Sequence, residues 1–157
     1  MTALDRLLAL VEAEHAAVYG YGVLGARLDD SRRRAALLAY DSHRARRDQL
    51  IAALRAAGGT PPAPLAAYDV TVSTPAEALA LAVRIEEGLG LRWLDLVADT
   101  DDRGLRQLAV AGVQESAVRA TQWRLRAGIT PATVALPGTD PTPTPTPAPV
   151  SPSPISD

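Results

Sequence analysis

The stretch from Val11 to Leu28, VEAEHAAVYGYGVLGARL, places an acid and a histidine inside the apolar pattern of a helix. Apolar and small residues recur there at steps of three and four, which lines up one helix face; they are Leu4, Leu7, Leu8, Val11, Val18, Gly22, Gly25 and Leu28. Glu14 falls on this line, whereas Glu12 points away and His15 lies on its flank. A carboxylate among Leu and Val is costly to bury alone. We therefore expect a cation, metal or hydrogen-bond donor from another helix to meet Glu14.

Three further segments share the helical spacing and have clear boundaries. Thr74, Pro75 and Glu77 provide an N-cap, a first-turn proline and a capping box, and Gly128 is a helix stop. The predicted helices run from Ala3 to Leu28, Ser31 to Ala57, Pro75 to Ala98 and Asp101 to Ala127. The apolar stripe predicted for the last one consists of Leu105, Leu108, Ala111, Gly112, Glu115, Val118, Gln122 and Leu125.

The connection between the second and third helices is long. Antiparallel neighbours in a bundle usually need only a few residues, but the segment from Gly58 to Thr74 reads GGTPPAPLAAYDVTVST. It can run the height of a bundle and start the third helix parallel to the second, with Leu65, Tyr68 and Val70 packing as it passes. The sequence therefore predicts an all-α fold, a four-helix bundle with a crossover between helices two and three.

Composition excludes several classes of function. All basic residues are arginine and there is no cysteine, so a lysine Schiff base, a P-loop lysine, a thiolate nucleophile and an iron–sulfur cluster are excluded. The net charge of -2 gives no basic footprint for nucleic acid. No apolar run reaches roughly 18 residues, so we expect no membrane span and, by default, a cytoplasmic location. No nucleophile elbow or Gly-rich phosphate loop favours a hydrolase or a nucleotide-binding protein.

The last part of the chain has a different composition. From about residue 139 it alternates Pro with small polar residues, DPTPTPTPAPVSPSPISD, and cannot bury enough apolar surface to fold. We predict a bundle domain of residues 1–138 and a disordered tail of residues 139–157. Ile129, Val134 and Leu136 are expected to form an apolar strap on the bundle. A ligand for an aromatic groove is disfavoured, because the tail has no flanking basic residue.

Inward acids on the first, third and fourth helices, together with the crossover, look like the ferritin-like fold. The segments AEHAAVYGYGVLGARL, SHRARRDQLIAAL, GGTPPAPLAAYDV, AVRIEEGL and GITPATVALPG together resemble a ferritin-like family of unknown function known mainly from actinobacteria. The resemblance covers about Ala3 to Gly138. It implies the bundle fold and no established activity.

Metal-binding ferritin-like proteins take one Glu from each of two helices and a Glu-x-x-His pair from each of the others. Glu14 and Glu86 match the single glutamates. The second helix instead carries Tyr40-x-x-His43, and the fourth keeps only Glu115 of its pair. One carboxylate and one imidazole are missing, which disfavours a di-iron oxidoreductase. The remaining set of Glu14, His43, Glu86 and Glu115 suffices for one iron, manganese or zinc ion with water.

A metal-free polar core is the alternative we favour. Arg47 lies one turn beyond His43, and Arg119 one turn beyond Glu115. Their guanidinium groups can neutralise inward acids in bidentate geometry. At 1.5 Å of rise per residue, the inward groups reach about the same height. We predict that Glu14 meets the others, which are His43, Arg47, Glu86 and Glu115.

Three functions follow, in order of preference: a non-catalytic scaffold or interaction module, a binder of one metal ion, and a di-iron oxidoreductase. The sequence names no substrate and no partner. Gly20, Gly22 and Gly25 each cost about 1 kcal/mol relative to Ala in a helix, so they indicate close approach of another helix, within the bundle or across a homodimer. Three tyrosines fit either a role beside a metal or ordinary half-buried positions: Tyr19, Tyr21 and Tyr40.

Overall fold

The structure, a computed structural model, describes residues 1–133. Its elements are α1 (Ala3–Gly25), α2 (Asp30–Ala56), α3 (Pro75–Asp99) and α4 (Arg103–Ala127), and no strand occurs among the described residues. The all-α, four-helix prediction is confirmed. Val134 and Leu136 of the predicted strap and the predicted tail lie outside the described residues. No helix within residues 1–133 is long and apolar enough to cross a membrane.

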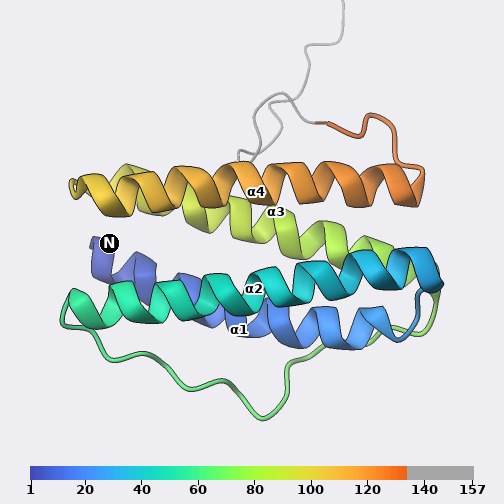
Figure 1. Cartoon of the computed structure of the whole chain (residues 1–157), viewed down its shortest axis with the longest axis horizontal. Helices are drawn as coiled ribbons and strands as arrows, with labels where there is room; N and C mark the ends of the chain where they lie inside the picture. Colours follow the sequence, from blue (N-terminus) through green and yellow to red (C-terminus); the bar gives the residue numbers. More distant parts are fainter. Residues whose placement is uncertain (134–157) are drawn as a thin grey trace, which may run out of the picture.

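The directions of the helices follow from the crossover. Figure 1 shows α1 and α4 running one way and α2 and α3 the other, so α2 and α3 are parallel. The segment between them returns along the outside of the α1–α2 pair to the end where α2 began (Figure 1). α1 packs on α2 and α3, and α3 packs on α4. The predicted crossover is therefore present.

Local capping explains where the helices begin and end. The Thr2 hydroxyl accepts from the Asp5 backbone N–H while the Asp5 side chain accepts from Thr2, a capping box that satisfies free N–H groups of α1. Thr74 and Glu77 form the same box at α3. Gly128, with φ of 71°, adopts the left-handed conformation that ends α4. α1 ends at Gly25, a turn before the predicted end.

The crossover is held to the bundle at particular points. His15 of α1 is buried, and its Nε2 lies 3.2 Å from the carbonyl oxygen of Pro62 in the crossover. Tyr68 and Val70 are half-buried, as expected. Leu65 is 65% exposed, so the prediction that it packs is wrong. Between its two ends, the connection from α2 to α3 bows away from the α1–α2 pair (Figure 1).

The face that α4 turns inward agrees with the predicted stripe at Leu105, Leu108 and Gly112 and differs from it further along the helix. Val118 and Leu125 are 55% and 64% exposed. The buried residues of α4 are Ala109, Gly112, Ser116, Ala120 and Trp123. Trp93 of α3 packs directly on Gly112, where a Cβ would overlap the indole ring. The lack of a side chain at Gly112 leaves the room that the Trp93 ring occupies.

Candidate functional site

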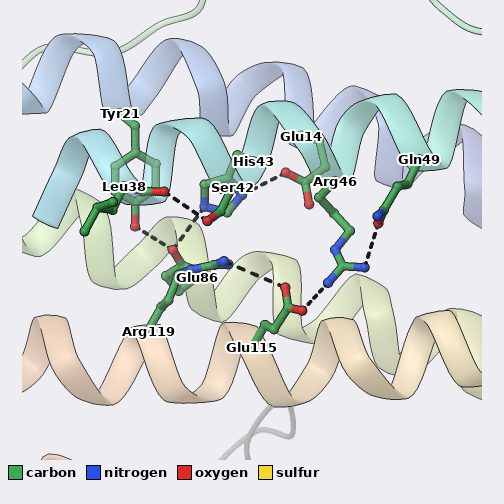
Figure 2. A network of polar contacts seen from close by, with 10 residues as sticks. All are labelled: Glu14, Tyr21, Leu38, Ser42, His43, Arg46, Gln49, Glu86, Glu115 and Arg119. Atoms are coloured by element: carbon green, nitrogen blue, oxygen red, sulfur yellow. Dashed lines mark hydrogen bonds and ion pairs between the residues drawn. The ribbon is translucent and has the colours of Figure 1, made fainter.

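Three helices each bring one ionisable side chain to the buried centre. Glu14 from α1, His43 from α2 and Glu86 from α3 are at most 1% exposed. His43 Nδ1 lies 2.8 Å from Glu14 Oε2, and His43 Nε2 lies 3.1 Å from Glu86 Oε1. Figure 2 shows the imidazole between the two carboxylates. The predicted convergence of these three residues is therefore observed.

The two contacts decide the protonation of His43. An ionised carboxylate only accepts hydrogen bonds, so both ring nitrogens must donate, and only the imidazolium has two N–H groups. Burial acts to lower the pKa of His43. The hydrogen bonds and charges of Glu14 and Glu86 outweigh it and raise the pKa from 6.5 to about 9. His43 is the cation of the core at neutral pH.

Tyr21 completes the network from α1. Its hydroxyl donates to Glu86 Oε1 at 2.5 Å, and its ring stacks on His43 with centroids 5.0 Å apart. Burial and the charge of Glu86 raise the pKa of Tyr21 well above 10, so the phenol keeps its proton and remains a donor. The sequence left the role of Tyr21 open. Tyr21 lies two helical turns after Glu14 and therefore on the same helix face, and this spacing could have predicted that it joins the centre.

One oxygen of the centre is left without a partner. Glu86 Oε1 accepts from both Tyr21 and His43, but the buried Oε2 has no hydrogen-bond partner among the described residues. Two carboxylates and one imidazolium also leave one negative charge in the core. An uncompensated buried carboxylate oxygen is costly, so the centre has unused capacity for a donor.

Glu115 does not join this centre, which corrects the sequence-based prediction. Its side chain is 44% exposed and forms ion pairs with Arg46 of α2 and, at 3.7 Å, with Arg119 (Figure 2). The inward face of α4 described above puts Ser116, one residue further on, in the buried position. Glu14 does meet His43 of the predicted group, but the prediction that Glu115 belongs to that group is wrong.

Arginine does not neutralise the inward acids either. Arg47 pairs with its neighbour Asp48 at 2.8 Å. Arg119 reaches Glu115 rather than the buried carboxylates. The expectation that a cation or hydrogen-bond donor from another helix meets Glu14 is confirmed, but that partner is His43 and neither Arg47 nor Arg119.

The donor set does not fit a ferritin-like metal centre in this arrangement. Zinc, for example, needs its His and carboxylate donors at about 2.0–2.2 Å from one point. Here the imidazole separates Glu14 from Glu86, so an ion beside either ring nitrogen reaches only one of them. Within residues 1–133, no three His, Asp or Glu side chains form a group that could hold a metal ion.

Solved structures place the chain in a class of fold. Two mutants of the Dps protein from Listeria innocua have a TM-score of 0.73 with this chain. Sequence identity is 14% and 13%; the alignments cover 82% of this chain and 95% and 97% of theirs. This likeness shows the fold alone. Together with the crossover topology, it makes the protein a ferritin-like helical bundle.

The family follows from sequence. Residues 7–141 match the family described as a domain of unknown function, DUF4439, and the chain belongs to that family. A conserved hypothetical protein from Mycobacterium tuberculosis is 35% identical, with a TM-score of 0.76 over 79% of this chain and 96% of that chain. No curated protein matches the sequence. The resemblance drawn from the sequence segments is confirmed.

Proposed function

We propose that this protein is a non-catalytic helical scaffold whose centre is held together by a proton on His43 rather than by a metal ion. The observation that supports it most is the position of the imidazole between Glu14 and Glu86, with both nitrogens in hydrogen bonds. A buried charge is tolerated when it is paired and hydrogen-bonded. The imidazolium pairs two carboxylates at once and ties α1, α2 and α3 together.

A metal ion must compete with that proton. Metals bind the neutral imidazole, so binding at His43 releases the proton. Because the pKa of His43 is about 9, its removal at pH 7 weakens metal binding by about 100-fold, or ~3 kcal/mol. The centre therefore favours the protonated, metal-free form.

A single metal ion remains the alternative, since Glu14, His43 and Glu86 do lie together. It requires a rotation of the imidazole or of a carboxylate that brings all three donors around one point. The di-iron oxidoreductase has less support, because Glu115, the fourth candidate, is occupied by arginines. The scaffold needs no such rearrangement.

Metal analysis combined with urea unfolding separates these functions. A ligand that binds only the native state raises the unfolding free energy, by about 4 kcal/mol at 1,000 times its Kd. For untagged protein supplied with iron, manganese and zinc, the scaffold predicts substoichiometric metal and an unchanged unfolding midpoint. One ion per chain, with a midpoint rise that Glu14→Gln abolishes, would establish the mononuclear site. Two ions with oxygen consumption would establish the oxidoreductase.

A scaffold also needs a surface to present. Large apolar side chains are exposed on α2 and α4: Leu37, Leu38, Val118 and Leu125. The partner that we propose to test first is a second copy of this chain, bound through these helix faces as a homodimer. Sedimentation over a range of concentrations measures it directly, and a constant monomer mass would eliminate it. The cytoplasmic location stays a prediction from composition.

A further inference from the structure

A cavity of about 290 Å³ lies between α3 and α4, beside the polar centre. Its walls are mostly small or aliphatic: Gly90, Val113, Ala117, Val118, Ala120 and Thr121 line it. The volume is near the lower end of ligand pockets, about 300 Å³. The small residues on the inward face of α4 leave this space beside Glu86.

Glu86 itself lines the cavity, and it is the residue whose Oε2 has no partner. Its other oxygen is already used by Tyr21 and His43. A water molecule can donate to Oε2, but it leaves the remaining negative charge of the centre uncompensated. A cation with an N–H group supplies both the donor and the charge. The ion pair between Glu87 and Arg124, which also lines the cavity, is already neutral.

We propose that this cavity binds a small organic cation, a primary ammonium group on a short aliphatic chain. The ammonium group donates to Glu86 Oε2, and the chain lies along Val113, Ala117 and Ala120. Because Oε2 is buried, its approach involves a side-chain adjustment of the kind common on binding. The inference does not depend on the scaffold role, since the site is tested on chelated, metal-free protein.

Calorimetry with three probes of equal chain length tests the ligand class. We expect n-hexylammonium to bind at least about tenfold more tightly than n-hexanol, because hydrogen bonds to charged groups are the stronger ones. Hexanoate should not bind at the same concentrations, since its carboxylate meets Glu86. Equal affinity for the amine and the alcohol, or no binding of either, would overturn the proposal.

Variants test the location. Ala117→Trp fills the cavity and should reduce hexylammonium affinity at least about tenfold, whereas Gln107→Trp, on the exposed surface of the same helix, should not. Glu86→Gln should remove the preference for the amine over the alcohol. Glu87→Gln, beside the cavity but outside the centre, should keep it. Binding that survives Ala117→Trp would refute the assignment.

A measurement on the unaltered protein guards against variants that fail to fold. Amide NMR shifts induced by hexylammonium should cluster at Gly90, Ser116 and Ala120, which line the cavity. Shifts concentrated on α2 or on the crossover would place the cation elsewhere and overturn the proposal. Metal bound at His43 in separate, unchelated samples would contradict the scaffold while leaving this result intact.

Discussion

At the scale of single residues, the balance of charge in the core depends on His43. The side chain is 1% exposed, so a neutral imidazole would leave two buried carboxylates without a counter-charge. The folded state therefore binds the His43 proton more tightly than the unfolded chain does. This difference links the stability of the protein to pH.

We predict that stability falls as the solution becomes alkaline. The pKa of His43 is about 9 in the folded protein against 6.5 as its ordinary value. A raised folded-state pKa gives a contribution that is complete below pH 6.5 and lost as pH rises through 9, about 3 kcal/mol in all. Urea unfolding between pH 6 and 9.5 measures it. His15→Gln should keep this decline, and a flat or rising profile would show that His43 is not the core cation.

Substitution of Glu14 should be far more harmful than that of Glu12. Glu14→Gln removes a charged hydrogen-bond acceptor from the buried imidazolium, whose counter-charge Glu86 remains, and should cost about 1.5–3 kcal/mol. Glu12 is exposed on the same helix, so Glu12→Gln should stay within about 0.5 kcal/mol. Chemical denaturation of both variants measures these changes in unfolding free energy. Equal, near-zero changes in unfolding free energy for the two variants would mean that the contact between Glu14 and His43 does not stabilise the fold.

Helical periodicity was enough to predict that Glu14, His43 and Glu86 meet. It could not identify the cation, because His43 and Arg47 share one stripe of α2. Only packing shows that the imidazole reaches both acids while Arg47 pairs with Asp48 at the edge of the bundle. Residue spacing therefore predicted the height of the centre but not which side chain neutralises it.

At the scale of helices, two glycines allow α4 and α1 to pack closely against side chains of α3. A Cβ on Gly112 of α4 would overlap the Trp93 ring, and one on Gly20 of α1 would lie 2.8 Å from Ile85 Cδ1. Gly22 has open space around the position of a Cβ. The close approach predicted from the glycines of α1 therefore holds for Gly20 and not for Gly22.

Two alanine substitutions should have opposite effects. Gly112→Ala forces Trp93 to move and should destabilise the protein by about 1–3 kcal/mol. Gly22→Ala meets no neighbour and should stabilise the protein by up to about 1 kcal/mol through helix propensity. Thermal unfolding of the two variants gives the comparison. A stabilising Gly112→Ala would show that Gly112 and Trp93 are not tightly packed.

The inward face of α4 could not be predicted from hydrophobicity alone. The predicted stripe held Gly112 but continued through the apolar Val118 and Leu125, whereas the buried face continues through Ser116, Ala120 and Trp123. The close fit of Gly112 to Trp93 involves a residue on another helix, which the spacing within α4 does not contain. The same difference in the buried face places Glu115 away from the predicted site.

At the scale of the whole molecule, capping residues and one long connection were enough to predict the topology. Thr2 and Thr74 begin helices, Gly128 ends one, and the crossover length makes α2 and α3 parallel. These signals are local and therefore readable in sequence. The central network then joins α1, α2 and α3 through His43, while Trp123 of α4 approaches it with its ring 6.1 Å from that of Tyr21.

The central claim is that a proton on His43, held between Glu14 and Glu86, occupies the place of a metal. Nitrogen-15 NMR of the His43 imidazole, recorded across pH with and without added zinc, tests it most directly. We predict protons on both ring nitrogens at neutral pH, a midpoint near pH 9, and no change with zinc. An unprotonated ring nitrogen at pH 7, or loss of a proton on addition of one equivalent of zinc, would contradict the account.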